Sequence, residues 1–116
     1  MARVFVIQNP HQADGDGGMK PKYDLSKAKK YGDFVYLLSP GAKPFAPNER
    51  VIEELREKLS QFDDDDYLLL IGNPALIGFA CAIAADFNDG RVSVLQWSTT
   101  RKDYVPIRAD LGKIEV

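Results

Sequence analysis

The sequence predicts a single three-layer α/β domain over residues 1–116, built on an open Rossmann-like or flavodoxin-like sheet of about five strands. Three observations support this fold class. Short apolar runs alternate with helical patterns, one run is apolar throughout, and the last run contains Pro106. A continuously apolar run is typical of a strand covered on both faces, and proline confines its strand to an edge. We therefore expect a mostly parallel sheet with an antiparallel C-terminal edge strand and about three helices.

The first part of the chain predicts two strands with a mobile loop between them. Arg3–Gln8 is apolar and rich in β-branched residues, which indicates a short buried strand. Residues 10–22 combine glycine and proline with almost no apolar side chain, which indicates a mobile surface loop. Asp24–Tyr31 is expected to form one or two helical turns that begin at an aspartate cap. Phe34–Leu38 is the second expected strand, and the proline-rich stretch Ser39–Asn48 is an expected loop.

The middle of the chain predicts two helices around a central strand. From Asn48, its expected N-cap, to Gln61 the apolar residues fall on one stripe and charged residues occupy the rest, as in a helix with one buried side. Tyr67–Ile71 is short and wholly apolar, which predicts the central strand. Asn73 is expected to cap the next helix, Pro74–Phe87, with proline at its first position.

The last part of the chain predicts two more strands, Arg91–Trp97 and Tyr104–Ala109. The linker between them, Ser98–Asp103, is short enough for an antiparallel return. Since Pro106 cannot donate to a neighbouring strand, Tyr104–Ala109 is expected at the edge of the sheet.

Composition excludes several classes of protein. A net charge of −2 and a pI near 5.3 argue against a dedicated duplex-DNA binder, so nucleic acid is not an expected partner. One cysteine, Cys81, excludes a disulfide framework, and one histidine, His11, excludes a multi-histidine metal site. The first apolar run is too short for a signal peptide, and no run approaches the ~20 residues of a membrane span. We therefore expect a cytoplasmic protein with no membrane partner.

Polar side chains gather where the expected parallel strands end. In open parallel sheets, ligands bind beyond these carboxyl ends. Gly72 and Asn73 also open the helix expected over Pro74–Phe87, and the free N–H groups at a helix start can hold an anion. The same residue types serve any strand-to-helix turn, and no glycine-rich phosphate motif is present. The candidate site for a nucleotide or another phosphate-bearing ligand consists of Asn9, His11, Ser39, Gly72 and Asn73.

The acidic runs are not expected to bind metal. The carboxylates of Asp63–Asp66 are adjacent in sequence and point in different directions, so a solvated turn is the simpler interpretation. Residues 14–17 begin like an EF-hand loop, but Leu25 stands where that loop needs glutamate. No Gly-x-Ser-x-Gly elbow occurs, and Cys81 lies mid-helix among alanines. The sequence therefore assigns no catalytic residue, metal or cofactor, and it favours a binding protein over an enzyme.

The helix expected over Pro74–Phe87 carries no charge before Asp86. The residues expected to face the sheet are Leu76, Phe79, Ala80, Ile83 and Phe87. A helix that is apolar all round is buried all round, either by another element of the domain or by a second chain. We expect a homodimer. Its interface residues would be Ile77, Gly78, Cys81, Ala82 and Ala85.

Two stretches, DDDYLLLIGNPA at 64–75 and GRVSVLQW at 90–97, resemble small α/β proteins encoded by tailed bacteriophages. The opening Arg3–Gln8 and the ending Tyr104–Ile107 resemble them as well, so the likeness spans most of the chain. The resemblance implies expression inside an infected bacterial cell. It brings no catalytic motif, so no site residue is carried over from it.

Two hypotheses of function follow. The first is a non-catalytic phage accessory protein that binds a host or phage macromolecule, such as a protein, with Tyr23, Trp97 and Tyr104 as candidate contacts. The second is a small-molecule binding protein, or an enzyme, with its site at the strand ends. A weaker possibility is a virion component in which lysines touch nucleic acid, although a solvated face is the commoner role of such a cluster. These lysines are Lys20, Lys22, Lys27, Lys29 and Lys30.

Overall fold

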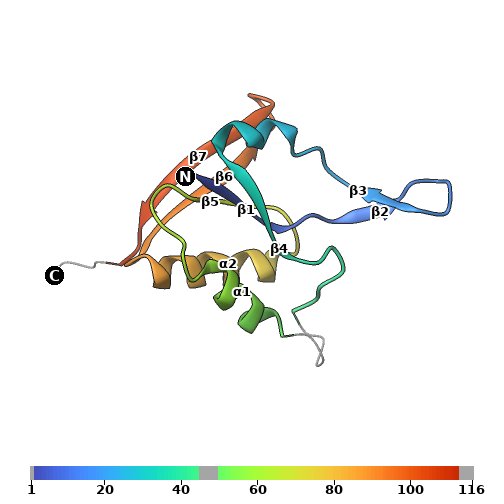
Figure 1. Cartoon of the computed structure of the whole chain (residues 1–116). Coiled ribbons are helices and arrows are strands. Elements are labelled where there is room, and N and C mark those ends of the chain that lie inside the picture. Colours follow the sequence, from blue (N-terminus) through green and yellow to red (C-terminus); the bar gives the residue numbers. More distant parts are fainter. Residues whose placement is uncertain (1, 45–49, 113–116) are drawn as a thin grey trace.

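A mixed five-stranded sheet in the order β4-β1-β5-β6-β7 organises the computed structural model, which describes residues 2–44 and 50–112 (Figure 1). β1, β4, β5 and β6 are parallel, and β7 pairs antiparallel with β6 at one edge. The strands are β1 (Arg3–Gln8), β4 (Asp33–Leu38), β5 (Tyr67–Leu69), β6 (Arg91–Ser98) and β7 (Asp103–Asp110). The predicted α/β class, with its antiparallel C-terminal edge strand, is confirmed.

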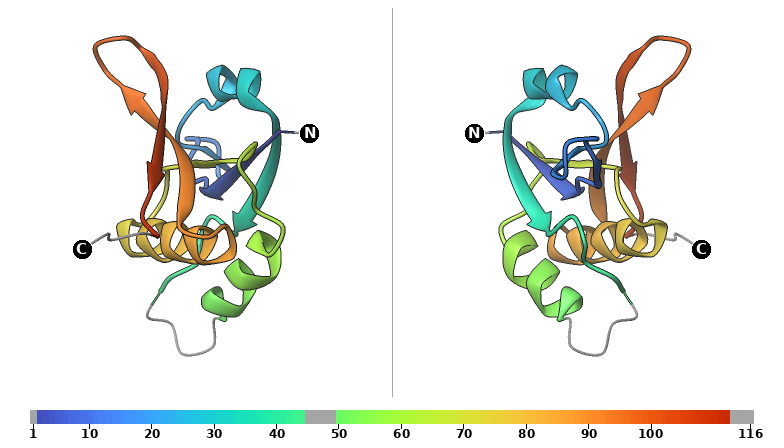
Figure 2. Two further views of the ribbon diagram at one scale, coloured as in Figure 1. Left: turned by 90° about the vertical axis from the view of Figure 1, so that its left-hand side faces the viewer. Right: turned by 90° about the vertical axis from the view of Figure 1, so that its right-hand side faces the viewer.

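The two faces of the sheet are covered unequally. Helices α1 (Val51–Leu59) and α2 (Pro74–Phe87) lie on one side, and the 3-10 helix η1 (Ser26–Tyr31) lies on the other (Figure 2). Because side chains alternate along a strand, Phe5 and its like-facing neighbours pack under the two α-helices, whereas Val4 and its neighbours pack under η1. The larger core therefore lies on the α-helical side.

The order of the parallel strands reverses at β1. The chain passes from β1 to β4 on one side, and then crosses back to β5 on the other side. Such a reversal leaves a crevice at the carboxyl ends of the two strands that flank it, which is where open α/β sheets usually bind ligands. This crevice lies between the ends of β1 and β5.

The two helix predictions differ in accuracy. α2 has the predicted bounds, and Asn73 caps it by accepting a hydrogen bond from the N–H of Ala75 at 2.9 Å. α1 ends at Leu59, two residues before the predicted Gln61, because Phe62 turns back and donates to the carbonyl of Leu59. The predicted N-cap of α1, Asn48, lies outside the described residues.

Two short strands pair as a hairpin within residues 10–22, the segment expected to be a mobile surface loop. β2 (His11–Ala13) pairs antiparallel with β3 (Met19–Pro21), and the hairpin extends away from the sheet (Figure 1). At its tip, the carboxylate of Asp14 accepts from the N–H groups of Asp16 and Gly18. The low apolar content that suggested a loop reflects a hairpin with hardly any buried side chain.

Two aromatic residues of α2 do not face the sheet as predicted. Phe79 and Phe87 are 41% and 40% exposed. The helix approaches the sheet through small side chains, since Ala80 and Ala84 are fully buried and lie in one row with Leu76. This close approach turns the buried stripe away from the two phenylalanines.

Candidate functional site

The crevice between β1 and β5 is occupied by the side chain of Gln8. Its Oε1 accepts from the N–H of Asn73 at 2.9 Å, and its Nε2 donates to the carbonyl of Ala42 at 2.8 Å. The N–H of Ala75 is bonded to the cap residue. Two backbone N–H groups at the start of α2, those of Asn73 and Ala75, are thus already bonded within the chain.

Gly72 permits this arrangement. Its φ is +120°, and a Cβ at this position would lie 2.6 Å from the Cβ of Gln8. Glycine tolerates both the positive φ and the close approach. The contact with Gln8 therefore accounts for Gly72 without a ligand.

The five predicted site residues do not share one cavity. Asn9, His11 and Ser39 line a cavity of about 530 Å³ between the hairpin, β4 and α1. Gly72 lines a different cleft, and Asn73 is tied to Gln8. The structure therefore brings three of the predicted residues together and separates the other two from them.

In the cavity of Asn9, His11 and Ser39, the side chain of Asn9 has a buried atom without a hydrogen-bond partner in the described part of the chain. Among the residues that the structure describes, its Oδ1 is the buried side-chain oxygen that has no hydrogen-bond partner. His11 lies beside it, with Nδ1 donating to the backbone carbonyl of Asn9 at 2.8 Å. The charges in the cavity wall are satisfied by each other, since Lys58 Nζ lies 2.8 Å from the carboxylate of Glu54. The rest of the cavity wall is mainly apolar, with Pro21, Tyr36 and Leu38 among its residues.

A larger cleft of about 650 Å³ lies on the η1 side of the sheet, at the carboxyl ends of β5 and β6. We call it the aromatic cleft, since it brings together the three aromatic residues that the sequence suggests as contacts. The residues on which its chemistry depends are Lys22, Tyr23, Lys27, Ile71, Trp97 and Tyr104.

The walls of the aromatic cleft combine exposed rings with ammonium groups. Trp97 is 43% exposed and Tyr23 is 48% exposed. Tyr104 is buried and packs edge to face against Trp97, with ring centroids 5.0 Å apart. Lys27 Nζ lies 5.8 Å from the Trp97 ring, and Lys22 Nζ lies 5.4 Å from the Tyr23 ring. The cleft can therefore hold a flat apolar group beside a negative charge.

Basic residues also lie around the aromatic cleft, and we call them together the basic face. Lys22 also lines a neighbouring cavity with Lys20 and Lys29. On the other side, Lys27 also lines a cavity that includes Lys102 in the β6–β7 turn. The members of the basic face are Lys20, Lys22, Lys27, Lys29, Lys30, Arg101 and Lys102.

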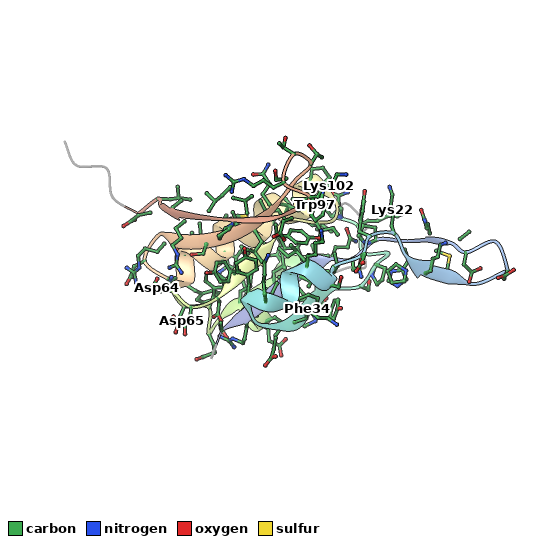
Figure 3. All side chains as sticks on the ribbon, turned by 90° about the horizontal axis from the view of Figure 1, so that it is seen from above. Lys22, Phe34, Asp64, Asp65, Trp97 and Lys102 are labelled. Carbon is green, nitrogen blue, oxygen red and sulfur yellow. The ribbon has the colours of Figure 1, made fainter. Side chains whose placement is uncertain are left out.

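Acidic residues gather at the opposite end of the sheet. Figure 3 shows Asp64 and Asp65 at the end remote from Trp97 and Lys22. Asp66 is fully buried there and forms an ion pair with Arg3 at 2.8 Å. The acidic residues at this end are Asp63, Asp64, Asp65, Asp66, Asp86, Asp89 and Asp110. Arg3, Arg91 and Arg108 lie among them and offset part of this negative charge. The small net charge of the chain is therefore the sum of a more acidic end and a more basic end.

Two aspartates near the basic face are held by nearby groups. Asp24 accepts from the N–H of Ser26 at 2.9 Å, and this bond lowers the pKa of its carboxyl. Asp103 pairs with Lys30, and the hydrogen bond from that ammonium lowers the pKa of the aspartate. Both carboxyls are ionised at neutral pH, and they offset only part of the positive charge around them.

The acidic run at 63–66 serves the fold. The buried carboxylate of Asp66 accepts from the backbone N–H of Asp63 as well as from Arg3. Asp64 accepts from Asn88 and Arg91, both at 2.9 Å. Within residues 2–44 and 50–112, no three His, Cys, Asp or Glu side chains are grouped as a metal site would need. Over the same ranges, no helix is both long enough and apolar enough to span a bilayer.

The residues predicted as a dimer interface lie at different depths on α2. Gly78 and Ala82 are exposed, Ile77 and Cys81 are half-buried, and Ala85 is buried. Burial raises the pKa of the Cys81 thiol, which disfavours its reactive thiolate. The exposed side of the helix is therefore narrower than predicted, and the homodimer stays a prediction.

Comparison with known proteins gives one match. The family model described as Phage Pam3 gp32-like protein matches residues 2–111, which confirms the resemblance to small phage-encoded proteins. No curated protein and no solved structure matches the chain. The comparisons thus supply a family, and the candidate site depends on the geometry above.

Proposed function

The chain belongs to the Phage Pam3 gp32-like protein family, and we propose that it is a non-catalytic phage accessory protein that binds an anionic macromolecule through its basic face. The observation that supports this proposal is that basic residues from three separate elements lie close together. Basic residues from the hairpin, η1 and the β6–β7 turn meet around a cleft with exposed aromatic rings. The partner would be a phage or host macromolecule in the cytoplasm of the infected cell.

The negative net charge does not prevent this binding. β6 separates the two charged ends and spans eight residues, about 23 Å at about 3.3 Å per residue. The screening length in ~0.1 M salt is about 10 Å, so a partner at the basic face interacts mainly with the charges of that face. The charge of the basic face therefore determines how strongly an anionic partner binds there. The acidic end repels the same partner and so favours an approach from the basic side.

Fluorescence anisotropy with two labelled polyanions tests the proposal. The probes are a polyglutamate peptide and a single-stranded oligodeoxynucleotide, in salt rising from about 50 to about 200 mM. We expect at least one probe to bind with a salt-dependent affinity. The double variant Lys22→Glu/Lys27→Glu should lose that binding, because it reverses the charge on both sides of the aromatic cleft.

Arg56→Glu is the matched control, since Arg56 is an exposed basic residue of α1, on the other side of the sheet. It should bind like the wild-type protein. Failure of both probes to bind the wild-type protein contradicts the proposal, and so does unchanged binding by the folded double variant. Circular dichroism establishes that the variants are folded.

The homodimer is a second part of the proposal, supported by the exposed side of α2. Gly78 and Ala82 flank the exposed ring of Phe79. This arrangement lets a second copy pack its own ring against small residues without meeting a like charge. Light scattering after size-exclusion chromatography should give a dimer mass for the wild-type protein and a monomer mass for Phe79→Glu. A wild-type monomer at micromolar concentration contradicts this part alone.

A second candidate function is the binding of a small ligand in the cavity of Asn9, His11 and Ser39. The unpartnered Oδ1 of Asn9 favours it, because a buried acceptor without a donor costs about 1–3 kcal/mol. Native mass spectrometry of gently purified protein should then show an adduct that Asn9→Ala loses. Unliganded wild-type protein from both a bacterial host and the infected cell contradicts this candidate.

A further inference from the structure

We propose that the aromatic cleft binds an unstacked base of single-stranded nucleic acid, while the basic face holds the phosphates on either side. This inference depends on the proposed function and names the class of its anionic partner. Proteins that bind single strands without sequence preference combine a positive groove with aromatic side chains on which bases stack. Both components are present here in one place.

The first step of the argument is the fit of the cleft to a base. Its volume of about 650 Å³ admits a planar group, and its apolar side includes Ile71. Trp97 and Tyr23 line the same cleft with roughly half of each side chain accessible. A base in the cleft can therefore stack on either ring, and stacking of this kind tolerates all four bases because each has a π-face.

The second step is the fixed position of Trp97. Tyr104 is buried against it edge to face, and the backbone carbonyl of Tyr104 accepts from the hydroxyl of Tyr31 in η1 at 3.2 Å. Packing against Tyr104 thus holds the indole in place, even though Trp97 lies close to the β6–β7 turn. A ring held in advance loses little conformational freedom on binding, which favours affinity.

The third step is the extent of the charge. A single nucleotide would need only the ammonium groups of Lys22 and Lys27, which lie beside the two exposed rings. The basic face continues beyond the cleft in both directions, toward Lys29 on one side and Lys102 on the other. A charged track with the aromatic cleft in its middle matches a polymer of phosphates rather than one phosphate.

The fourth step separates nucleic acid from an acidic polypeptide and from duplex. Carboxylate side chains would use the lysines but would leave the partly exposed rings of Trp97 and Tyr23 without a flat partner. In a duplex the bases are stacked and paired, so a base reaches a cleft only after it has been extruded. The combination of rings and charge therefore favours a single strand.

The test uses the intrinsic fluorescence of Trp97, which is the only tryptophan of the sequence. Three probes of matched charge are compared: oligothymidylate of about twelve nucleotides, an abasic phosphodiester strand of equal length, and polyglutamate. We expect oligothymidylate to quench Trp97 and to bind about tenfold more tightly than the abasic strand, because only the former offers bases to stack. The abasic strand should bind in a salt-dependent manner without quenching.

Two variants locate the effect. Tyr23→Ala keeps the reporter and should reduce the preference for bases, and Trp97→Ala should abolish that preference while the abasic strand still binds. Phe87→Ala, at an exposed aromatic residue of α2 outside the proposed dimer interface, should behave like the wild-type protein. If Trp97→Ala does not fold, Tyr23→Ala alone decides the role of the cleft.

The outcomes distinguish this inference from the proposed function. Equal binding of oligothymidylate and the abasic strand, with no quenching, overturns the base site and leaves an anionic partner. Tighter binding of polyglutamate than of oligothymidylate also overturns the base site and points to an acidic polypeptide. If none of the three probes binds, both the inference and the proposed function fail.

Discussion

The side chain of Gln8 accepts a hydrogen bond from the backbone N–H of Asn73 at 2.9 Å, which joins the end of β1 to the first turn of α2. The same side chain donates to the loop that follows β4. The side chain of Gln8 thus fills part of the edge of the sheet where open α/β folds usually bind ligands. The aromatic cleft lies at the same edge, on the η1 side, and is lined by Pro10 after β1 and by Ile71 and Gly72 after β5.

Replacing Gln8 by leucine should destabilise the protein by about 2–4 kcal/mol. The change leaves the N–H of Asn73 and the carbonyl of Ala42 without their partner, and each unsatisfied buried group costs about 1–3 kcal/mol. Urea unfolding measures the difference. Gln12→Leu, at an exposed amide of the hairpin, is the control and should change the free energy of unfolding by less than about 0.5 kcal/mol. Equal effects of the two substitutions would argue against a structural role for Gln8.

Gly72→Ala should cost more than about 2 kcal/mol, because a Cβ there meets the Cβ of Gln8 at 2.6 Å and the residue has a positive φ. Thermal unfolding measures the loss. Gly41→Ala is the control, since nothing lies within 4 Å of the Cβ it would add. Combining Gly72→Ala with Gln8→Gly should cost less than the sum of the two single losses, since Gln8→Gly removes the Cβ that the new methyl group meets. Strict additivity of the two losses would contradict this contact.

Asp66→Ala should be strongly destabilising, by about 3–5 kcal/mol, because it leaves the guanidinium of Arg3 without its buried partner. Asp65→Ala changes an exposed neighbour in the same acidic run and should be nearly neutral. Chemical unfolding of the two variants separates a structural role from a metal site. If Asp65→Ala and Asp66→Ala lose the same stability, and added divalent cations raise that of the wild-type protein, the run binds metal instead.

The acid limb of the stability curve should depend on Asp64. Hydrogen bonds from Asn88 and then Arg91 lower the pKa of its carboxyl below the ordinary value of 3.8. A carboxyl whose pKa is lower in the folded state adds stability above its unfolded pKa, and that stability is lost as pH falls through the folded pKa. Asp64→Asn should therefore be less stable than the wild-type protein at neutral pH and approach it near pH ~2. A constant difference between pH ~2 and pH ~7 would contradict this assignment.

Much of the fold can be predicted because its signals are local. Asn73 and Pro74 mark the start of α2 within two residues, and the apolar run of β5 alone indicates a covered strand. The hairpin at 10–22 is missed because its strands bury almost nothing and so show no alternation of polarity. The exposure of Phe79 depends on how closely two alanines let α2 approach the sheet. The spacing of apolar residues in the sequence does not give that distance.

The candidate site depends on contacts between distant residues, so less of it can be predicted. The bond from Asn73 to Gln8 joins residues 65 positions apart, and Lys27 donates to the carbonyl of Lys102 across 75 positions. The net charge of the sequence sums the lysines of the basic face and the aspartates of the opposite end, so it reveals neither group. Only the folded sheet separates them and places Trp97 among the lysines.

The measurement that most directly tests the basic face as the binding surface is a map of amide chemical shifts. The ¹⁵N-labelled protein is titrated with a single-stranded oligonucleotide and observed by NMR. The shifts should concentrate on Lys22, Lys27 and the indole N–H of Trp97, while Asp64 and Phe79 should stay unchanged. Shifts centred on α2 or on the acidic end, with Trp97 unperturbed, would contradict the assignment of the basic face.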